Sequence, residues 1–322
     1  MVLWRRRAVK RDLCNICGVS GYESEVAKRI YEILKNTKHD DLKIDVVGNV
    51  ILLKKGKIGQ KKVMISAHMD EVGFQVINKI SDYMYKIKPL GNIKTWNAFQ
   101  QRVESNNSFG VIRAFDEANL RANNYENIYL EILNGNGVET GDIFGFEKNF
   151  KETDTDYFGK ALDNRLACSL LIEIIKENIS TSADIYYVFT TQEEIGMRGI
   201  RVAKSTIAPD YFINIDVSAV GNMNSIQMSK GVGIKISDSM CVSSIELVKL
   251  LKEIAIDSNI IFQMEVSDCG TSELIITNEL DYGMEEVGIS IPCKYLHSAN
   301  SVVKKDDLME CEKLIHKMVK KF

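Results

Sequence analysis

From Gly159 to the C-terminus, the sequence alternates between short apolar runs and longer segments whose apolar residues recur at helical spacing. A helix-like segment comes first, and strand-like runs and further helices follow it. In chain order, the predicted elements cover residues 163–178, 185–190, 211–215, 244–258, 287–291 and 306–321. Such alternation is typical of an α/β fold, in which a largely parallel sheet is flanked by helices.

Three further elements are predicted nearer the N-terminus. The apolar run Val63–Ala67 is typical of a buried strand, and it ends in the polar segment His68–Glu71. Residues 44–53 resemble a hairpin, because a Gly-Asn pair separates two apolar runs. Ser20–Glu23 has the form of a capping box, which predicts an amphipathic helix over residues 21–35.

The segment between these two regions has a different pattern of apolar and polar residues. Residues 73–156 contain short alternating apolar runs and loops rich in Asn and Gly, and they show no long helical pattern. This pattern predicts a small β domain inserted into an α/β chain. We therefore expect a catalytic domain formed by residues 1–72 and 157–322, with an inserted β domain over residues 73–156 that serves dimerisation or assembly.

The overall composition excludes several classes of protein. Of the 322 residues, 45% are hydrophobic and 26% are charged, which is typical of a compact globular chain. The net charge of −3 argues against a nucleic-acid-binding protein, whose surface should be strongly basic. No apolar run approaches the roughly 20 residues that a membrane span needs. We expect neither a nucleic acid nor a membrane among the partners.

Two further features concern location. Five positive charges lie among the first eleven residues, with no apolar segment of signal-peptide length after them, so we expect a solvated arm. The number of cysteines is odd and they are scattered, which suits reduced thiols in the cytoplasm better than a disulfide framework. They occupy positions 14, 17, 168, 241, 269, 293 and 311.

Polar side chains follow the predicted strands where the strands end. In open α/β sheets, ligands bind beyond the carboxyl ends of the strands, so these side chains are the candidates for chemistry. Two of the four histidines of the chain belong to this set. The candidates are His68 and Asp70 after the strand at 63–67, Asp163 before a helix, Glu193 and Glu194 after the strand at 185–190, Asp216 after the strand at 211–215, and His297 after the strand at 287–291.

Five of these residues form the inventory of a two-metal hydrolytic centre. Such a centre needs one bridging carboxylate and about two further ligands for each metal. We assign Asp163 as the bridge, His68 and Asp216 to one metal, and Glu194 and His297 to the other. Histidine nitrogen and carboxylate oxygen suit Zn²⁺, and the same set accepts Co²⁺ or Mn²⁺.

Two residues beside these ligands have different predicted roles. Asp70 can accept the second N–H of the His68 imidazole and fix its tautomer. Glu193 is the candidate general base, which would take a proton from the water activated by the two metals and pass it to the leaving amine. We therefore name Glu193 and Asp70 as the catalytic pair.

Four segments of the sequence resemble the signatures of a known family, and they occur in the family's order. They are Ala67–Phe74, Gly159–Arg165, Gln192–Gly199 and Ile291–Ser298. The chain thereby resembles the dinuclear-metal aminopeptidases of the glutamyl, lysyl and leucyl tetrahedral type (clan MH), some of which were once labelled endoglucanase or cellulase M.

The resemblance implies an α/β catalytic domain with an inserted PDZ-like β domain. It also implies removal of N-terminal amino acids from peptides, and homo-oligomeric hollow assemblies, commonly tetrahedral dodecamers. The metal-binding and catalytic roles argued above are those that the family has at the matching positions.

The sequence departs from the family pattern in three places. The inserted domain lacks the Pro-Pro-His segment that is common in relatives after the Val-Ile at 111–112. Relatives usually read Gly-Thr-Asp-Ala where this chain has Gly-Thr followed by Ser272 and Glu273, and they read Pro-Val-Glu where it has Ala299-Asn300-Ser301. None of these changes removes a predicted metal ligand. Glu273 or Asp268 is the candidate for a displaced anionic contact to the ammonium group of the substrate.

Two alternative functions compete with this interpretation. A di-metal deacylase or amidohydrolase would use the same ligands on N-acyl amino acids, and the altered segment at 270–273 would reflect the change of substrate. A non-catalytic assembly subunit would need neither the ligands nor the base, so their presence argues against it. The sequence favours the metallo-aminopeptidase.

Overall fold

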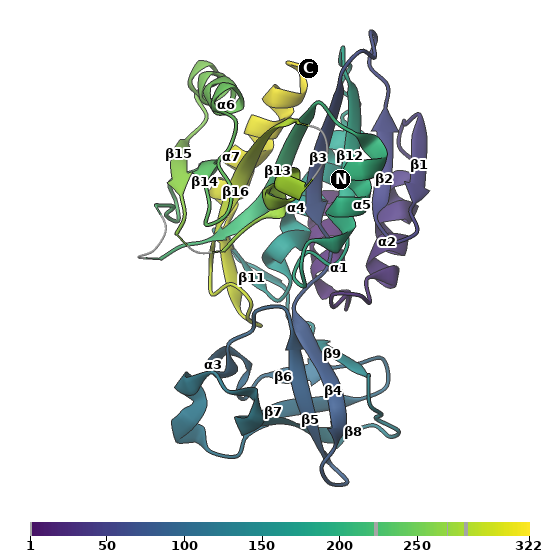
Figure 1. Ribbon diagram of the computed structural model, residues 1–322, viewed down its shortest axis with the longest axis vertical. Helices are drawn as coiled ribbons and strands as arrows, with labels where there is room; N and C mark the ends of the chain where they lie inside the picture. Colours follow the sequence, from purple (N-terminus) through teal and green to yellow (C-terminus); the bar gives the residue numbers. More distant parts are fainter. Residues whose placement is uncertain (1, 222–224, 269, 280–282) are drawn as a thin grey trace.

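The computed structural model describes residues 2–221, 225–268, 270–279 and 283–322. The chain forms two parts, a large α/β part and a smaller barrel that extends from one end of it (Figure 1). Residues from both ends of the sequence build the α/β part.

An eleven-stranded sheet forms the centre of the α/β part. Its order along the main path is β1 (Asp41–Ile44), β2 (Val50–Lys54), β12 (Asp184–Thr190), β3 (Lys62–His68), β13 (Tyr211–Ala219), β16 (Glu285–Lys294), β17 (Ser301–Lys304), β11 (Asp156–Gly159) and β10 (Lys151–Glu152). Beside this path, β14 (Val232–Ser237) pairs with β16 and with β15 (Phe262–Val266).

The sheet is mixed, which corrects the expectation of a largely parallel one. The central strands β12, β3, β13 and β16 are parallel, as the alternation of strands and helices predicts. The rest of the main path is antiparallel, and so is the pair β14–β16. Short connections join β1 to β2, β10 to β11 and β16 to β17, and such connections cannot join parallel strands.

Helices cover both faces of this sheet. The main helices are α1 (Val2–Asn15), α2 (Ser24–Leu34), α4 (Leu162–Lys176), α5 (Arg198–Ile207), α6 (Ile245–Asp257) and α7 (Lys305–Val319). Alternate residues of β3 show the two layers: Val63 and Ile65 belong to the core on the α4 side, whereas Met64 packs with Ile200 of α5 and Phe212 on the other face.

The N-terminal region differs from the prediction in two ways. Residues expected to form a solvated arm form α1 instead, and Leu13 near its end is fully buried. The capping-box interpretation is also wrong, because α2 begins at Ser24 and has no side-chain cap. The Ser20 hydroxyl donates to the Asp70 carboxylate at 2.6 Å, and the Glu23 carboxylate accepts from the backbone N–H of Gln192 at 2.9 Å. These long-range partners take the place of a helix cap, and the Glu23 carboxylate keeps one local bond, from the backbone N–H of Gly21 at 2.8 Å.

The inserted segment forms a closed antiparallel barrel with a core of its own. Phe74 and Phe146 meet there edge to face, with ring centroids 5.5 Å apart. In the order of the barrel, the strands are β4 (Gly73–Lys79), β5 (Met84–Leu90), β8 (Ile128–Asn134), β7 (Phe109–Ala114), β6 (Arg102–Glu104) and β9 (Ile143–Phe146). The short helices α3 (Thr95–Ala98), η1 (Glu117–Ala122) and η2 (Tyr125–Asn127) lie between barrel strands. Strand β10, which the sequence placed in the insertion, pairs in the large sheet.

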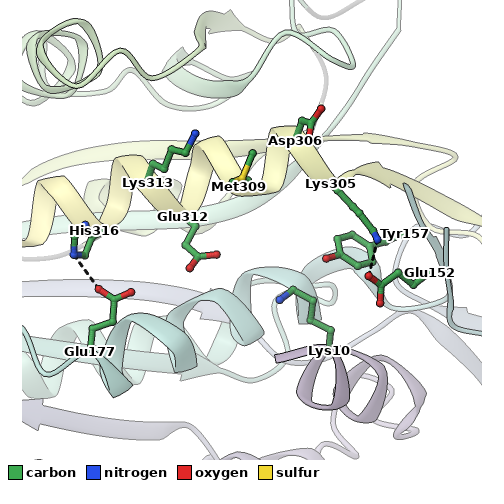
Figure 2. A pocket seen from close by; sticks show the side chains of 10 residues that line it. All are labelled: Lys10, Glu152, Tyr157, Glu177, Lys305, Asp306, Met309, Glu312, Lys313 and His316. Carbon is green, nitrogen blue, oxygen red and sulfur yellow. Dashed lines mark hydrogen bonds and ion pairs between the residues drawn. The ribbon is translucent and has the colours of Figure 1, made fainter. Parts of the chain in front are cut away.

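A charged groove of about 550 Å³ lies between α7, α4 and α1 (Figure 2). Ion pairs cross it: His316 lies 2.9 Å from Glu177, and Lys305 lies 2.6 Å from Glu152. None of the predicted metal ligands is among its lining residues. Across the described parts of the chain, every helix is too short or too polar to cross a membrane.

Candidate metal centre

The five predicted metal ligands meet where the carboxyl ends of the central strands face the barrel. Each comes from a different part of the fold. His68 ends β3, Asp163 lies at the start of α4, Glu194 follows β12, Asp216 belongs to β13, and His297 lies in the turn between β16 and β17. The position of Asp216 is a small correction, because β13 continues to Ala219 and the residue lies within the strand rather than after it.

Asp163 occupies the centre of the group. Its Oδ1 lies 2.9 Å from Nε2 of His68, and its Oδ2 lies 3.3 Å from Nε2 of His297. Asp216 joins His68 on the Oδ1 side of Asp163, with its own Oδ1 at 3.5 Å from His68 Nε2. Glu194 joins His297 on the Oδ2 side, with its Oε2 at 3.2 Å from His297 Nε2. On each side, one ligand atom from each of three residues lies within 4.8 Å of the others. One carboxylate therefore belongs to two three-residue groups.

The electrostatics of these groups fit divalent cations. Burial and neighbouring carboxylates, opposed by histidine, raise the pKa values of Glu194 and Asp216. Burial would lower the pKa of His68, but Glu193, Asp163 and other acids outweigh it and raise that pKa well above its ordinary value. So many acidic groups in one buried place repel each other, and a bound cation favours their ionised forms.

Asp70 connects a metal-ligand candidate to the loop after β12. This aspartate is fully buried, and its Oδ1 lies 3.3 Å from Nδ1 of His68. It also accepts the backbone N–H groups of Glu193 at 3.0 Å and Glu194 at 3.1 Å. Burial would raise the pKa of Asp70, but His68 and the Ser20 hydroxyl outweigh burial and lower it. An ionised Asp70 can therefore orient both the imidazole and the loop.

Glu193 lies against the same centre. A ligand atom of its side chain is within 4.8 Å of those of His68 and Glu194, and the residue is 8% exposed. Burial raises its pKa well above the ordinary value for glutamate, and the charges of Asp216, Glu194 and Asp70 add to this, against the opposing effect of His68. A carboxylate with a raised pKa accepts a proton more readily, which suits a general base.

The barrel also contributes to this region. The carbonyl of Asn92, just after β5, lies 3.1 Å from Nδ1 of His297. Ala299, one of the departures from the family pattern, packs into the core of the barrel. The loop that carries His297 is therefore held by contacts from both parts of the chain.

Sequence reasoning missed a buried charged cluster beside Asp163. Glu71, Lys160 and Arg165 are at most 1% exposed. The Glu71 carboxylate accepts from Lys160 Nζ at 2.7 Å and from the backbone N–H of Gly18 at 3.0 Å, and Arg165 Nη2 lies 3.6 Å away. All three residues lie in segments that resemble the family signatures, Ala67–Phe74 and Gly159–Arg165. Their spacing in the sequence does not indicate a buried ion pair.

Replacing Lys160 by Met should cost about 3–5 kcal/mol of unfolding free energy, because the Glu71 charge would stay buried without its main partner. Chemical denaturation of the metal-free protein measures this. Lys61→Met is the matched control, since Lys61 is exposed to solvent and its ion pair with Asp210 should contribute little to stability. Equal losses in the two variants would contradict the prediction.

The structure corrects the expectation for Glu273. This residue is fully buried, so it cannot contact the ammonium group of a substrate. Its carboxylate accepts hydrogen bonds from the Ser66 and Thr190 hydroxyls, each at 2.5 Å. Asp268, the other candidate, is exposed.

Comparison with known proteins identifies the family. The profile of the M42 glutamyl aminopeptidase family matches residues 48–314. A putative aminopeptidase of Acetivibrio thermocellus is 32% identical over 323 residues, which cover 95% of this chain and 96% of the relative.

Solved structures agree with this result. Aminopeptidase APDkam598 of Desulfurococcus kamchatkensis superposes with a TM-score of 0.90 at 26% identity, over 99% of this chain and 96% of the other. The TET1 peptidase of Pyrococcus horikoshii shares the fold, with a TM-score of 0.87 at 23% identity over 98% of this chain and 100% of the other. The chain therefore belongs to the M42 glutamyl aminopeptidase family and is a metal-dependent aminopeptidase.

Proposed function

We propose that this aminopeptidase holds two divalent cations, with Asp163 between them. The observation that carries the proposal is the position of the two Asp163 carboxylate oxygens. One oxygen faces His68 and the other faces His297. His68 and Asp216 would hold one cation, and Glu194 and His297 the other. Zinc is the proposed metal, and Co²⁺ or Mn²⁺ would suit the same donor atoms.

The residues around the two cations have separable roles in the proposed reaction. Bound divalent cations polarise a peptide carbonyl and lower the pKa of water. Glu193 accepts the proton of the attacking water and delivers it to the nitrogen of the leaving peptide. Asp70 holds His68 and the 193–194 backbone in place.

We propose that the substrates are peptides with a free N-terminal amine. Elemental analysis of the purified protein, together with a panel of free-amino and N-acylated amino-acid amides, tests this. We expect about two metal ions per chain and cleavage of the free-amino compounds only, with added Zn²⁺, Co²⁺ or Mn²⁺. Cleavage of the acylated compounds would instead indicate a deacylase, and retention of no metal would contradict the assigned ligands.

We further propose that the chain assembles into a homo-oligomer, a tetrahedral dodecamer, through its inserted barrel, which we expect to be PDZ-like. The TET1 peptidase of Pyrococcus horikoshii can assemble into a tetrahedron or a large octahedral shell. The barrel exposes large apolar side chains that an interface would cover, among them Tyr83 and Leu133. Light scattering coupled to size-exclusion chromatography should give the mass of twelve chains, and a monomer would contradict this.

We place the protein in the cytoplasm. Cys14, Cys168 and Cys293 are fully buried and free. Burial raises the pKa values of Cys14 and Cys168 to about 12, which keeps these thiols protonated. Buried free thiols suit a reducing compartment.

A further inference from the structure

Glu273 lies at the start of the short helix η3 (Glu273–Glu279), and its carboxylate ends in a polar layer beneath the metal centre. Its Oε2 accepts from the Ser66 hydroxyl at 2.5 Å and from the Asn214 amide at 3.1 Å. Its Oε1 accepts from the Thr190 hydroxyl at 2.5 Å. Both carboxylate oxygens therefore have partners inside the protein.

The three partners belong to three adjacent strands of the sheet. Ser66 lies on β3, Thr190 ends β12, and Asn214 lies on β13, directly across from Ser66. One carboxylate thus ties together three adjacent parallel strands. The Asn214 amide also lies 3.2 Å from the Ser66 hydroxyl, which closes the network between β3 and β13.

The same three strands, β3, β12 and β13, lead to the metal-binding and catalytic candidates. His68 follows Ser66 by two residues, and Asp216 follows Asn214 by two, so each pair projects from the same face of the sheet. Two residues span roughly 6.5–7 Å along a strand. Thr190 lies directly across from His68, and Glu193 follows Thr190 by three residues. Glu273 is therefore one side-chain layer below the centre, on the same face.

Other contacts fix Glu273 from the outside. Lys204 Nζ donates to its backbone carbonyl at 3.2 Å. The preceding residue, Ser272, donates its backbone N–H and its hydroxyl to Asp238 Oδ2 at 3.2 and 3.0 Å. Hydrogen bonds of their own thus hold residues 272–273 in place, independently of the Glu273 carboxylate. Burying a carboxylate is costly, so an apolar side chain would serve better if only packing were needed.

We infer that Glu273 is a positioning residue, which sets the spacing of the three strand ends so that His68, Asp216 and the loop with Glu193 converge on the cations. This inference rests on the two-cation centre proposed above. Glu273 itself reaches neither substrate nor metal, so its effect passes through Ser66, Thr190 and Asn214. It should alter how tightly the centre binds metal, in addition to any effect on stability.

The test measures metal affinity on protein freed of metal. Zn²⁺ is titrated in competition with a chromophoric chelator, and Co²⁺ binding is followed by its visible absorption spectrum. We expect Glu273→Ala to weaken metal affinity at least tenfold and to change the Co²⁺ spectrum. Glu273→Gln retains one acceptor oxygen and should recover part of that affinity.

Asp307→Asn is the matched control. Asp307 is also a buried carboxylate, 1% exposed, and it accepts the backbone N–H groups of Ser229 and Gly231, each at 2.8 Å. Its contacts lie on α7 and the loop before β14, away from the three strand ends. We expect this variant to lose thermal stability while it binds metal with wild-type affinity.

Wild-type affinity and an unchanged Co²⁺ spectrum in Glu273→Ala would overturn the inference and leave Glu273 a packing residue. If Glu273→Ala does not fold, Ser66→Ala and Thr190→Val each remove one hydrogen bond and should weaken metal affinity about threefold or more. Wild-type affinity in both would overturn the inference equally. Failure of the proposed function would show differently, because the wild-type protein itself would then bind no metal.

Discussion

Glu193→Gln lowers kcat by roughly a thousandfold or more, the range expected when a general base is lost, and the variant keeps its full metal content. The amide has nearly the shape of the carboxylate, so the packing of this 8%-exposed side chain is preserved. It cannot accept a proton at neutral pH, and the attacking water therefore keeps its proton. Steady-state kinetics at saturating substrate, with elemental analysis of the same sample, measures both quantities.

Glu25→Gln serves as the control for this experiment. Glu25 is an exposed acid in α2, outside the centre, and its variant should match the wild type in turnover and in metal content. Full turnover in Glu193→Gln would show that another group accepts the proton. Loss of metal from that variant would instead show that Glu193 acts as a ligand, which its closeness to His68 and Glu194 permits.

Asp163→Ala has the second large effect, because it removes the one carboxylate common to both groups of ligands. We expect the metal content to fall from about two ions per chain toward none, with activity lost in parallel. His297→Ala removes a ligand from one group only, so it should leave about one ion per chain, held by His68, Asp163 and Asp216. Elemental analysis after dialysis distinguishes the two variants.

A different result would change the assignment of Asp163. If Asp163→Ala retained one tightly bound ion, the two groups would be independent and Asp163 would belong to one of them. If His297→Ala lost both ions, His297 would support the whole centre rather than one side. Circular dichroism on each variant checks that the loss of metal is not a loss of fold.

The candidate ligands could be proposed from the sequence because four of them stand at or shortly after apolar runs long enough to form buried strands, and Asp163 stands at the start of a predicted helix. Strand ends were less certain. Asp216 lies inside β13 because pairing with β16 continues as far as Ala219. The strands β14 and β15 were not predicted, since Val232–Ser237 and Phe262–Val266 mix polar and apolar residues.

Interactions between distant parts of the chain explain the remaining differences. Ser20 has a local pattern that favours helix capping, but its hydroxyl donates a hydrogen bond to the buried Asp70 carboxylate, 50 residues away. A hydrogen bond to a charged group is stronger than a neutral cap. The partners of Glu273 lie 207, 83 and 59 residues away, so no local pattern indicates its place.

The contacts of Asp70 have a consequence for how substitutions combine. Asp70 faces the His68 imidazole with one oxygen, and it receives the backbone N–H groups of both Glu193 and Glu194. A change at Asp70 should therefore alter the orientation of His68 and the position of Glu193 together. In a double-mutant cycle, the free-energy costs of changing Asp70 and Glu193 should not add, because the second change disrupts an arrangement that the first has already released.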